Sequence, residues 1–137
     1  MMTTLEPAYL DSSFIVRYLT NDPPPMAEKA AAIIDSDQPL LVSELILAER
    51  AYVLSSVYQV LRPDVVDALL AFVQRANVKL THLAKPIALD ALRLCKQSKR
   101  VSFADALLWT EVFRGASQQV YTFDVRFPGD EINILRG

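Results

Sequence analysis

The sequence predicts an α/β fold, a three-layer α/β/α sandwich around a central, mainly parallel sheet. Short apolar segments of strand length alternate along the chain with single helices or helix pairs, and this order is typical of parallel strands covered by helices on both faces. The 137 residues are 52% hydrophobic and 22% charged, as in a packed globular protein. With only three glycines and no internal repeat, residues 1–137 are expected to form a single domain.

The individual elements follow from hydrophobic spacing and from capping residues. Strands are expected at 7–11, 40–42, 78–80, 119–123 and 132–135. Helices are expected at 12–20, 26–35, 44–58, 63–76, 86–97 and 103–114. Ser43 and Ser102 are predicted N-caps, Pro63 suits a first helical turn, and Gly115 ends the helix before it.

The composition excludes several classes of protein. A single cysteine, Cys95, and a single histidine, His82, cannot build an internal disulfide or a Cys/His zinc site. We find no signal-peptide pattern and no apolar run of membrane-spanning length, and therefore expect a cytoplasmic protein. The net charge of −2 excludes a strongly basic domain but leaves room for a local basic patch.

Four of the sixteen acidic residues stand inside apolar sequence, where a carboxylate is costly without a cation or strong donors. They are Asp11, Glu49, Asp105 and Asp124. Asp11 and Asp124 each follow a predicted strand, and the carboxyl ends of parallel strands share one edge of a sheet. We therefore predict that the four acids meet at this edge around a bound cation, and hard oxygen ligands suit Mg²⁺ or Mn²⁺.

Each acid also has a purely structural explanation. Asp105 lies three residues after Ser102, which is a capping-box spacing, and Asp11 precedes a helix that it can cap. Glu49 can form a surface ion pair, and Asp124 can be an ordinary turn residue.

Four segments resemble the signature segments of PIN-domain ribonucleases, and most closely those of VapC-type toxins from toxin–antitoxin pairs. They are LDSSFIVRYLTND (10–22), VSELILAE (42–49), SFADALL (102–108) and YTFDVRF (121–127). The resemblance covers nearly the whole chain in order and spacing and implies a PIN-like fold. By position, Asp11, Glu49 and Asp105 match the acidic triad of the family, and Asp124 matches its more variable fourth acid.

The chain departs from the family pattern at two positions. Ser13 stands where the family often has Asn, and Ser102 stands where it often has another acid, so the number of bound metal ions is left open. Thr122 matches a family Ser/Thr that contacts the metal ligands rather than the metal itself. Ser13 can likewise hydrogen-bond a carboxylate or a metal-bound water.

The resemblance implies a metal-dependent endoribonuclease that is held inactive by a VapB-like antitoxin and forms a homodimer. The sequence offers apolar candidates for the dimer surface, some of which must instead fill the core: Phe14, Ile15, Tyr18, Ile33, Ile34, Tyr52 and Tyr58. Basic residues near the acidic motifs are candidates for holding RNA: Arg17, Lys96, Lys99, Arg100 and Arg126.

Two other functions stay open, a housekeeping RNA-processing PIN nuclease and a non-catalytic module whose acidic pocket binds a basic partner. A metal-dependent phosphatase is disfavoured because Ser13 stands where its strand-end motif needs Asp, and a nucleotide hydrolase lacks its glycine-rich loop.

Overall fold

The structure is a computed structural model that describes residues 6–56, 61–97, 101–129 and 131–137, without the side chains at 51–53, 55 and 56. Its strands are β1 (Ala8–Tyr9), β2 (Leu40–Val42), β3 (Val78–Leu80), β4 (Gln119–Tyr121) and β5 (Asn133–Leu135). Its helices are α1 (Ser12–Thr20), α2 (Pro24–Ile34), α3 (Glu44–Ser56), α4 (Arg62–Val73), α5 (Lys85–Gln97) and α6 (Phe103–Arg114).

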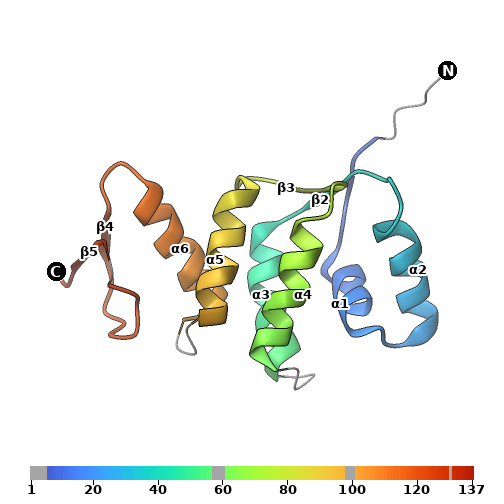
Figure 1. Cartoon of the computed structure of the whole chain (residues 1–137), viewed down its shortest axis with the longest axis horizontal. Coiled ribbons are helices and arrows are strands. Elements are labelled where there is room, and N and C mark those ends of the chain that lie inside the picture. Colours follow the sequence, from blue (N-terminus) through green and yellow to red (C-terminus); the bar gives the residue numbers. More distant parts are fainter. Residues whose placement is uncertain (1–5, 57–60, 98–100, 130) are drawn as a thin grey trace.

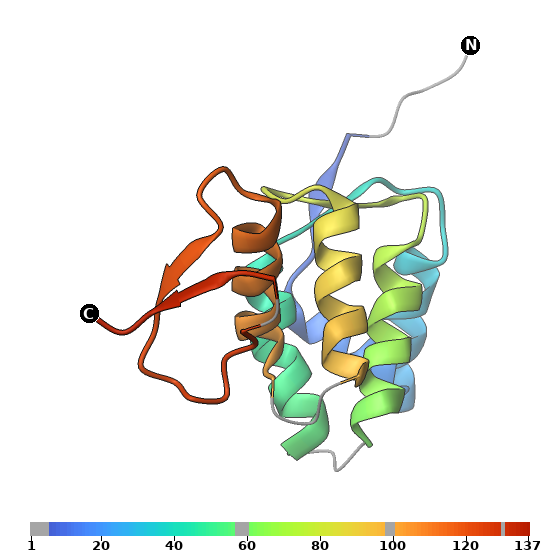
Figure 2. The same cartoon turned by 60° about the vertical axis from the view of Figure 1, so that its left-hand side comes forward.

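The described strands are all paired in parallel, so the predicted α/β class with a parallel sheet is confirmed. The structure differs in one detail, because the strands are divided between a sheet of order β1-β2-β3 and a separate β4-β5 pair. Figures 1 and 2 both show β4 and β5 beyond α6, at the end of the molecule opposite α2. Apolar patterning identifies a strand but does not name its neighbour, so sequence reasoning could not foresee this division.

One hydrophobic core holds the first sheet and the helices together. Its fully buried side chains include Ile15, Leu47, Phe72 and Leu92, from α1, α3, α4 and α5. The core cluster extends to Ala106 of α6 but contains no residue of β4 or β5. The second sheet is therefore packed largely apart from the main core.

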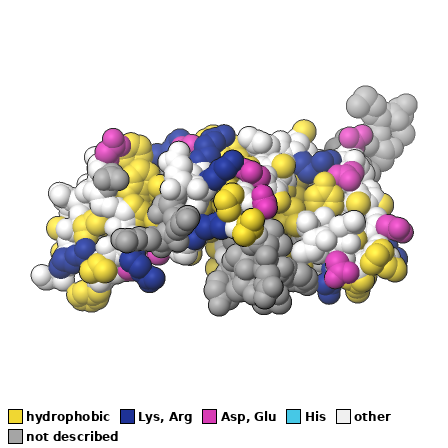
Figure 3. Space-filling view, turned by 60° about the horizontal axis from the view of Figure 1, so that its bottom comes forward, with side chains coloured by type: hydrophobic (Ala, Val, Ile, Leu, Met, Phe, Trp, Pro, Cys, Tyr) yellow, Lys and Arg dark blue, Asp and Glu magenta, His cyan; other side chains and the backbone are white. Residues whose placement is uncertain are grey.

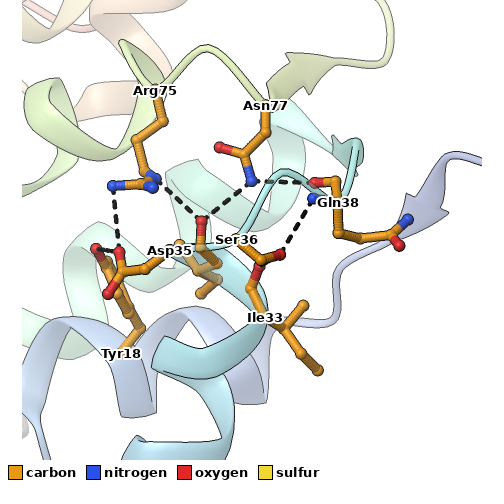
Figure 4. A network of polar contacts seen from close by, with 8 residues as sticks. Tyr18, Ile33, Asp35, Ser36, Gln38, Arg75 and Asn77 are labelled. Atoms are coloured by element: carbon orange, nitrogen blue, oxygen red, sulfur yellow. Dashed lines mark hydrogen bonds and ion pairs between the residues drawn. The ribbon is translucent and has the colours of Figure 1, made fainter. Parts of the chain in front are cut away.

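A polar network fastens the end of α2 to α1 and to the segment after α4 (Figure 4). Asp35 accepts a hydrogen bond of 2.6 Å from the Tyr18 hydroxyl and forms an ion pair of 3.2 Å with Arg75 Nη1. Arg75 Nε and Asn77 Nδ2 both donate to the Ile34 carbonyl, at 3.1 and 3.0 Å. Burial, together with the bond to Asp35, raises the pKa of Tyr18. The network satisfies a carbonyl that the end of a helix leaves without an intrahelical partner.

Several predicted boundaries shift when the chain is packed. The helix predicted to reach residue 76 ends at Val73, and the strand predicted to reach residue 123 ends at Tyr121. The helix predicted over 44–58 is described to Ser56, and Tyr58 lies outside the described residues. No helix in the described part of the chain has the length and apolarity needed to cross a membrane.

The apolar surface predicted for a dimer is mostly part of the core. Ile15 and Ile34 are fully buried, and Phe14 and Tyr18 are packed against the core cluster. Ile33 alone among the described candidates is exposed, and the side chain of Tyr52 lies outside the described residues. Helical spacing cannot say which face of α1 and α2 meets the sheet, so several of the candidates fill the core, and the homodimer and its surface stay predictions.

Candidate active site

Asp11 stands directly before α1 and caps it. Its Oδ2 accepts hydrogen bonds from the Ser13 hydroxyl at 2.6 Å and from the Ser13 backbone N–H at 3.1 Å. These two bonds hold the pKa of Asp11 below its ordinary value, and the positive charge of Arg50 acts in the same direction. The predicted hydrogen bond from the Ser13 hydroxyl to a candidate carboxylate is present, and the second bond, from the Ser13 N–H, caps α1.

Glu49 and Asp105 lie on two helices that contact each other, α3 and α6. Glu49 is exposed, a turn and a half from the beginning of α3. Asp105 is half-buried in the first turn of α6, where its N–H donates to the Ser102 hydroxyl at 3.1 Å. Ser102 is therefore the N-cap that the sequence predicts.

Asp124 follows β4 and lies in a turn. Its Oδ1 accepts from the Arg126 backbone N–H at 2.8 Å and pairs with Arg126 Nε at 3.2 Å. These contacts lower the pKa of Asp124. The Asp124 N–H donates to Thr122 Oγ1 at 3.0 Å, so Thr122 fixes the backbone that carries the acid. Because β4 belongs to the second sheet and β1 to the first, Asp124 and Asp11 do not follow strands of one sheet edge.

Three of the acid-bearing elements are nonetheless neighbours. Helix α3 contacts both α1 and α6, and Figure 1 shows it between them. Among the described residues, no group of three or more Asp, Glu, His or Cys side chains lies close enough to hold a metal ion. The packing thus gathers the elements that carry Asp11, Glu49 and Asp105, but in the described part of the chain their carboxylates do not form such a group.

Glu44 is a buried acid that the sequence analysis did not single out. Its Oε1 accepts from the backbone N–H groups of His82 and Leu83 at 2.7 and 2.8 Å, and its Oε2 accepts from Thr81 Oγ1 at 3.1 Å. Burial raises the pKa of Glu44, but the bonds from the N–H groups outweigh burial and hold this pKa below its ordinary value. Its place in VSELILAE, amid apolar residues, is the signal that could have identified it.

A shallow cavity of about 300 Å³ lies between α3, the segment after β3, and α6. Its lining includes Ala48 and Ala104, each one residue before a candidate acid on the same helix. Leu45 and Leu108, which are 68% and 42% exposed, also line it. The acids Glu49 and Asp105 do not line this cavity, so it is next to the candidate site and is not part of it.

Two of the predicted RNA-holding cations already have acidic partners. Lys96 Nζ pairs with Asp67 at 2.7 Å, and Arg126 pairs with Asp124. Arg17 Nη1 donates to the Asp22 carbonyl at 3.5 Å, and Lys99 and Arg100 lie outside the described residues.

The chain matches the family model of the PIN domain over residues 8–129, a span that contains all four candidate acids. A comparison with curated proteins found no match. PIN domains are generally nucleases that act on RNA, and PIN nucleases generally use divalent metal ions. Since the match covers most of the chain and its strands and helices follow the same α/β plan, the protein belongs to the PIN-domain family.

Proposed function

We propose that this protein is an endoribonuclease that hydrolyses RNA phosphodiester bonds with Mg²⁺ or Mn²⁺. Asp11, Glu49 and Asp105 are its main carboxylates, and Asp124 is a fourth, weaker contributor. The observation that carries the proposal is the family match together with the contacts of α3, which bears Glu49, with α1, which Asp11 caps, and with α6, which bears Asp105.

The chemistry of the donor set suits a hard divalent cation. Asp11 and Glu49 are exposed, and Asp11 stays ionised to a lower pH than an ordinary aspartate. When bound, the metal would activate water and stabilise the charge that develops on the phosphate. Ser13 orients Asp11, Ser102 fixes the beginning of the helix that carries Asp105, and Thr122 fixes the backbone of Asp124.

The test is cleavage of a mixed RNA with Mg²⁺, with Mn²⁺ and with EDTA, followed by mapping of the fragment ends. We expect cleavage that requires metal and falls by roughly a hundredfold or more in Asp11→Asn, because a metal ligand contributes several kcal/mol of transition-state stabilisation. Asn also caps helices well, so this substitution removes the charge and keeps the contact with Ser13.

Matched variants show whether a loss of cleavage is specific to the candidate acids. Asp37→Asn makes the same chemical change at an exposed loop acid and is expected to leave cleavage unchanged. Asp124→Asn is expected to cost less than Asp11→Asn, since Asp124 follows a strand of the second sheet and is already paired with Arg126. Full activity of Asp11→Asn would overturn the assignment.

The same proposal extends to the cellular role, a cytoplasmic toxin that acts as a homodimer and is held by a small VapB-like antitoxin. Its support is the resemblance to VapC-type toxins and the acidic site, to which an arginine of a partner can form bidentate bonds. The test is growth after expression of the chain alone and with a neighbouring small reading frame, with light scattering of the purified protein at tens of micromolar. Normal growth without a binding neighbour would leave a housekeeping RNA-processing nuclease.

A further inference from the structure

The segment that begins with β4 exposes three large apolar side chains in succession. Tyr121, Phe123 and Val125 are 74%, 89% and 86% exposed, whereas Val120 is only 8% exposed. Exposed residues alternate with buried or half-buried ones from 119 to 125, which puts Tyr121 and Phe123 on the same side of an extended chain. We call Tyr121, Phe123 and Val125 the aromatic strip. Large apolar groups left together at a surface usually mark a binding site.

Two arginines flank the aromatic strip. Arg136 is exposed, and its Nη1 donates to the backbone carbonyls of Thr122 and Asp124, at 2.8 and 3.4 Å. These carbonyls are neutral, but the charge of Arg136 also acts on the Asp124 carboxylate and helps to lower its pKa, so the strip has two arginines beside one carboxylate. Arg126 has a side chain that is 66% exposed, with Nε against Asp124. At the end of the molecule where β4 and β5 lie, the left end in Figure 3, apolar and cationic side chains lie next to one another.

The apolar side chains and the two arginines together indicate which kind of molecule binds the aromatic strip. The two arginines outnumber the Asp124 carboxylate, so a second copy of the chain would bring two surfaces of net positive charge together, which disfavours self-association through the strip. Aromatic faces beside arginines are instead the chemistry that holds unpaired nucleobases and their phosphates. A base-paired helix keeps its bases stacked inside, so the exposed rings fit single-stranded RNA.

We propose that Tyr121 and Phe123 stack against unpaired bases of single-stranded RNA, with Arg136 and Arg126 contacting the adjacent phosphates. This inference rests on the proposed ribonuclease function in one respect: Asp124, a candidate acid, lies between Phe123 and Val125, so RNA held on the strip passes beside it. The strip is thus a substrate-positioning surface that favours loops and single strands over duplexes.

The experiment measures binding without cleavage. A fluorescein-labelled single-stranded oligoribonucleotide of ten nucleotides is titrated with the full chain in EDTA, and anisotropy is recorded at several salt concentrations. Phe123→Ala and Tyr121→Ala are each expected to weaken binding by about tenfold, as loss of a base–aromatic stack does. Tyr9→Ala is the matched control, because Tyr9 is 78% exposed but lies on β1.

Conservative variants distinguish stacking from mere apolar contact. Phe123→Trp should keep the affinity, and Phe123→Leu should lose it about as fully as Phe123→Ala. Arg136→Gln should reduce the dependence of log Kd on log salt by about one unit, and Arg136→Lys should keep it. An RNA duplex of the same length should bind equally to the wild type and to Phe123→Ala.

Two results would overturn the inference. One is equal RNA affinity for Phe123→Ala and Tyr9→Ala, or full affinity for Phe123→Leu. The other is a dimer in light scattering that Phe123→Ala dissociates, which would assign the strip to a second copy. Failure of the proposed function is distinguishable, because it would appear as no metal-dependent cleavage by the wild type while the binding losses at Phe123 remained.

Discussion

The side chain of Glu44 is only 10% exposed. Its carboxylate accepts hydrogen bonds from the backbone after β3 and so connects this segment to the beginning of α3. Its pKa is lower in the folded protein than in the unfolded chain, so its contribution to stability is present above the unfolded pKa and is lost as pH falls through the folded pKa. We expect Glu44→Gln to lower the free energy of unfolding by about 1–3 kcal/mol at pH 7, since the N–H groups lose a charged acceptor.

Urea denaturation at pH 7 and at successively lower pH checks this expectation. The difference between the wild type and Glu44→Gln should shrink as the pH falls below the ordinary glutamate range, because the wild-type carboxyl becomes neutral as well. Glu111→Gln is the control, an exposed acid on α6 that lines the same cavity. If the two variants unfold alike at every pH, Glu44 does not stabilise the fold through its charge.

At the scale of an element, the end of α6 depends on Gly115. A Cβ added to this residue would lie 2.8 Å from the Glu111 carbonyl oxygen, and backbone cannot move aside as a side chain can. Gly115→Ala is therefore expected to destabilise the protein by roughly 1–3 kcal/mol, the usual cost of overpacking. At Gly129 the nearest atom is the flexible Cδ1 of Ile134, 3.3 Å away, so Gly129→Ala should cost less. Thermal unfolding of both variants compares them, and equal melting temperatures would contradict the steric argument.

Local patterns in the sequence predicted most helices and strands, but they did not predict which strands pair with one another. Ser102 was identified as an N-cap from its spacing alone, and the structure shows its bond to the Asp105 N–H, because capping involves only residues three positions apart. The sequence did not predict that β4 and β5 form a sheet of their own, since apolar patterning does not indicate which strands lie side by side.

The candidate site shows the same limit. Apolar surroundings selected Asp11 and Asp105 among the sixteen acids, and the helices that carry them both contact α3. Whether a carboxylate faces another or caps a helix depends on side-chain positions that the sequence does not encode locally. Asp11 and Asp124 accordingly show the cap and the turn that were their structural alternatives, and their role in metal binding remains a prediction.

At the scale of the whole molecule, metal binding and folding stability are linked. A cation that binds the native chain and not the unfolded one stabilises the fold by about 2.7 kcal/mol at a concentration a hundredfold above its Kd. We therefore expect the melting temperature of the wild type to rise with added Mn²⁺ or Mg²⁺, because a cation held by Asp11, Glu49 and Asp105 would link α3 to the beginnings of α1 and α6, which it contacts in the fold.

Asp11→Asn makes this expectation specific to the proposed site. Without metal, the variant should melt close to the wild-type temperature, since Asn keeps the cap on α1 and loses only the charge that the bonds from Ser13 favour. With metal, its melting temperature should barely change, whereas that of Asp37→Asn should rise as in the wild type. If metal raised the melting temperature of Asp11→Asn as much as that of the wild type, the cation would bind elsewhere in the molecule. This test needs no RNA.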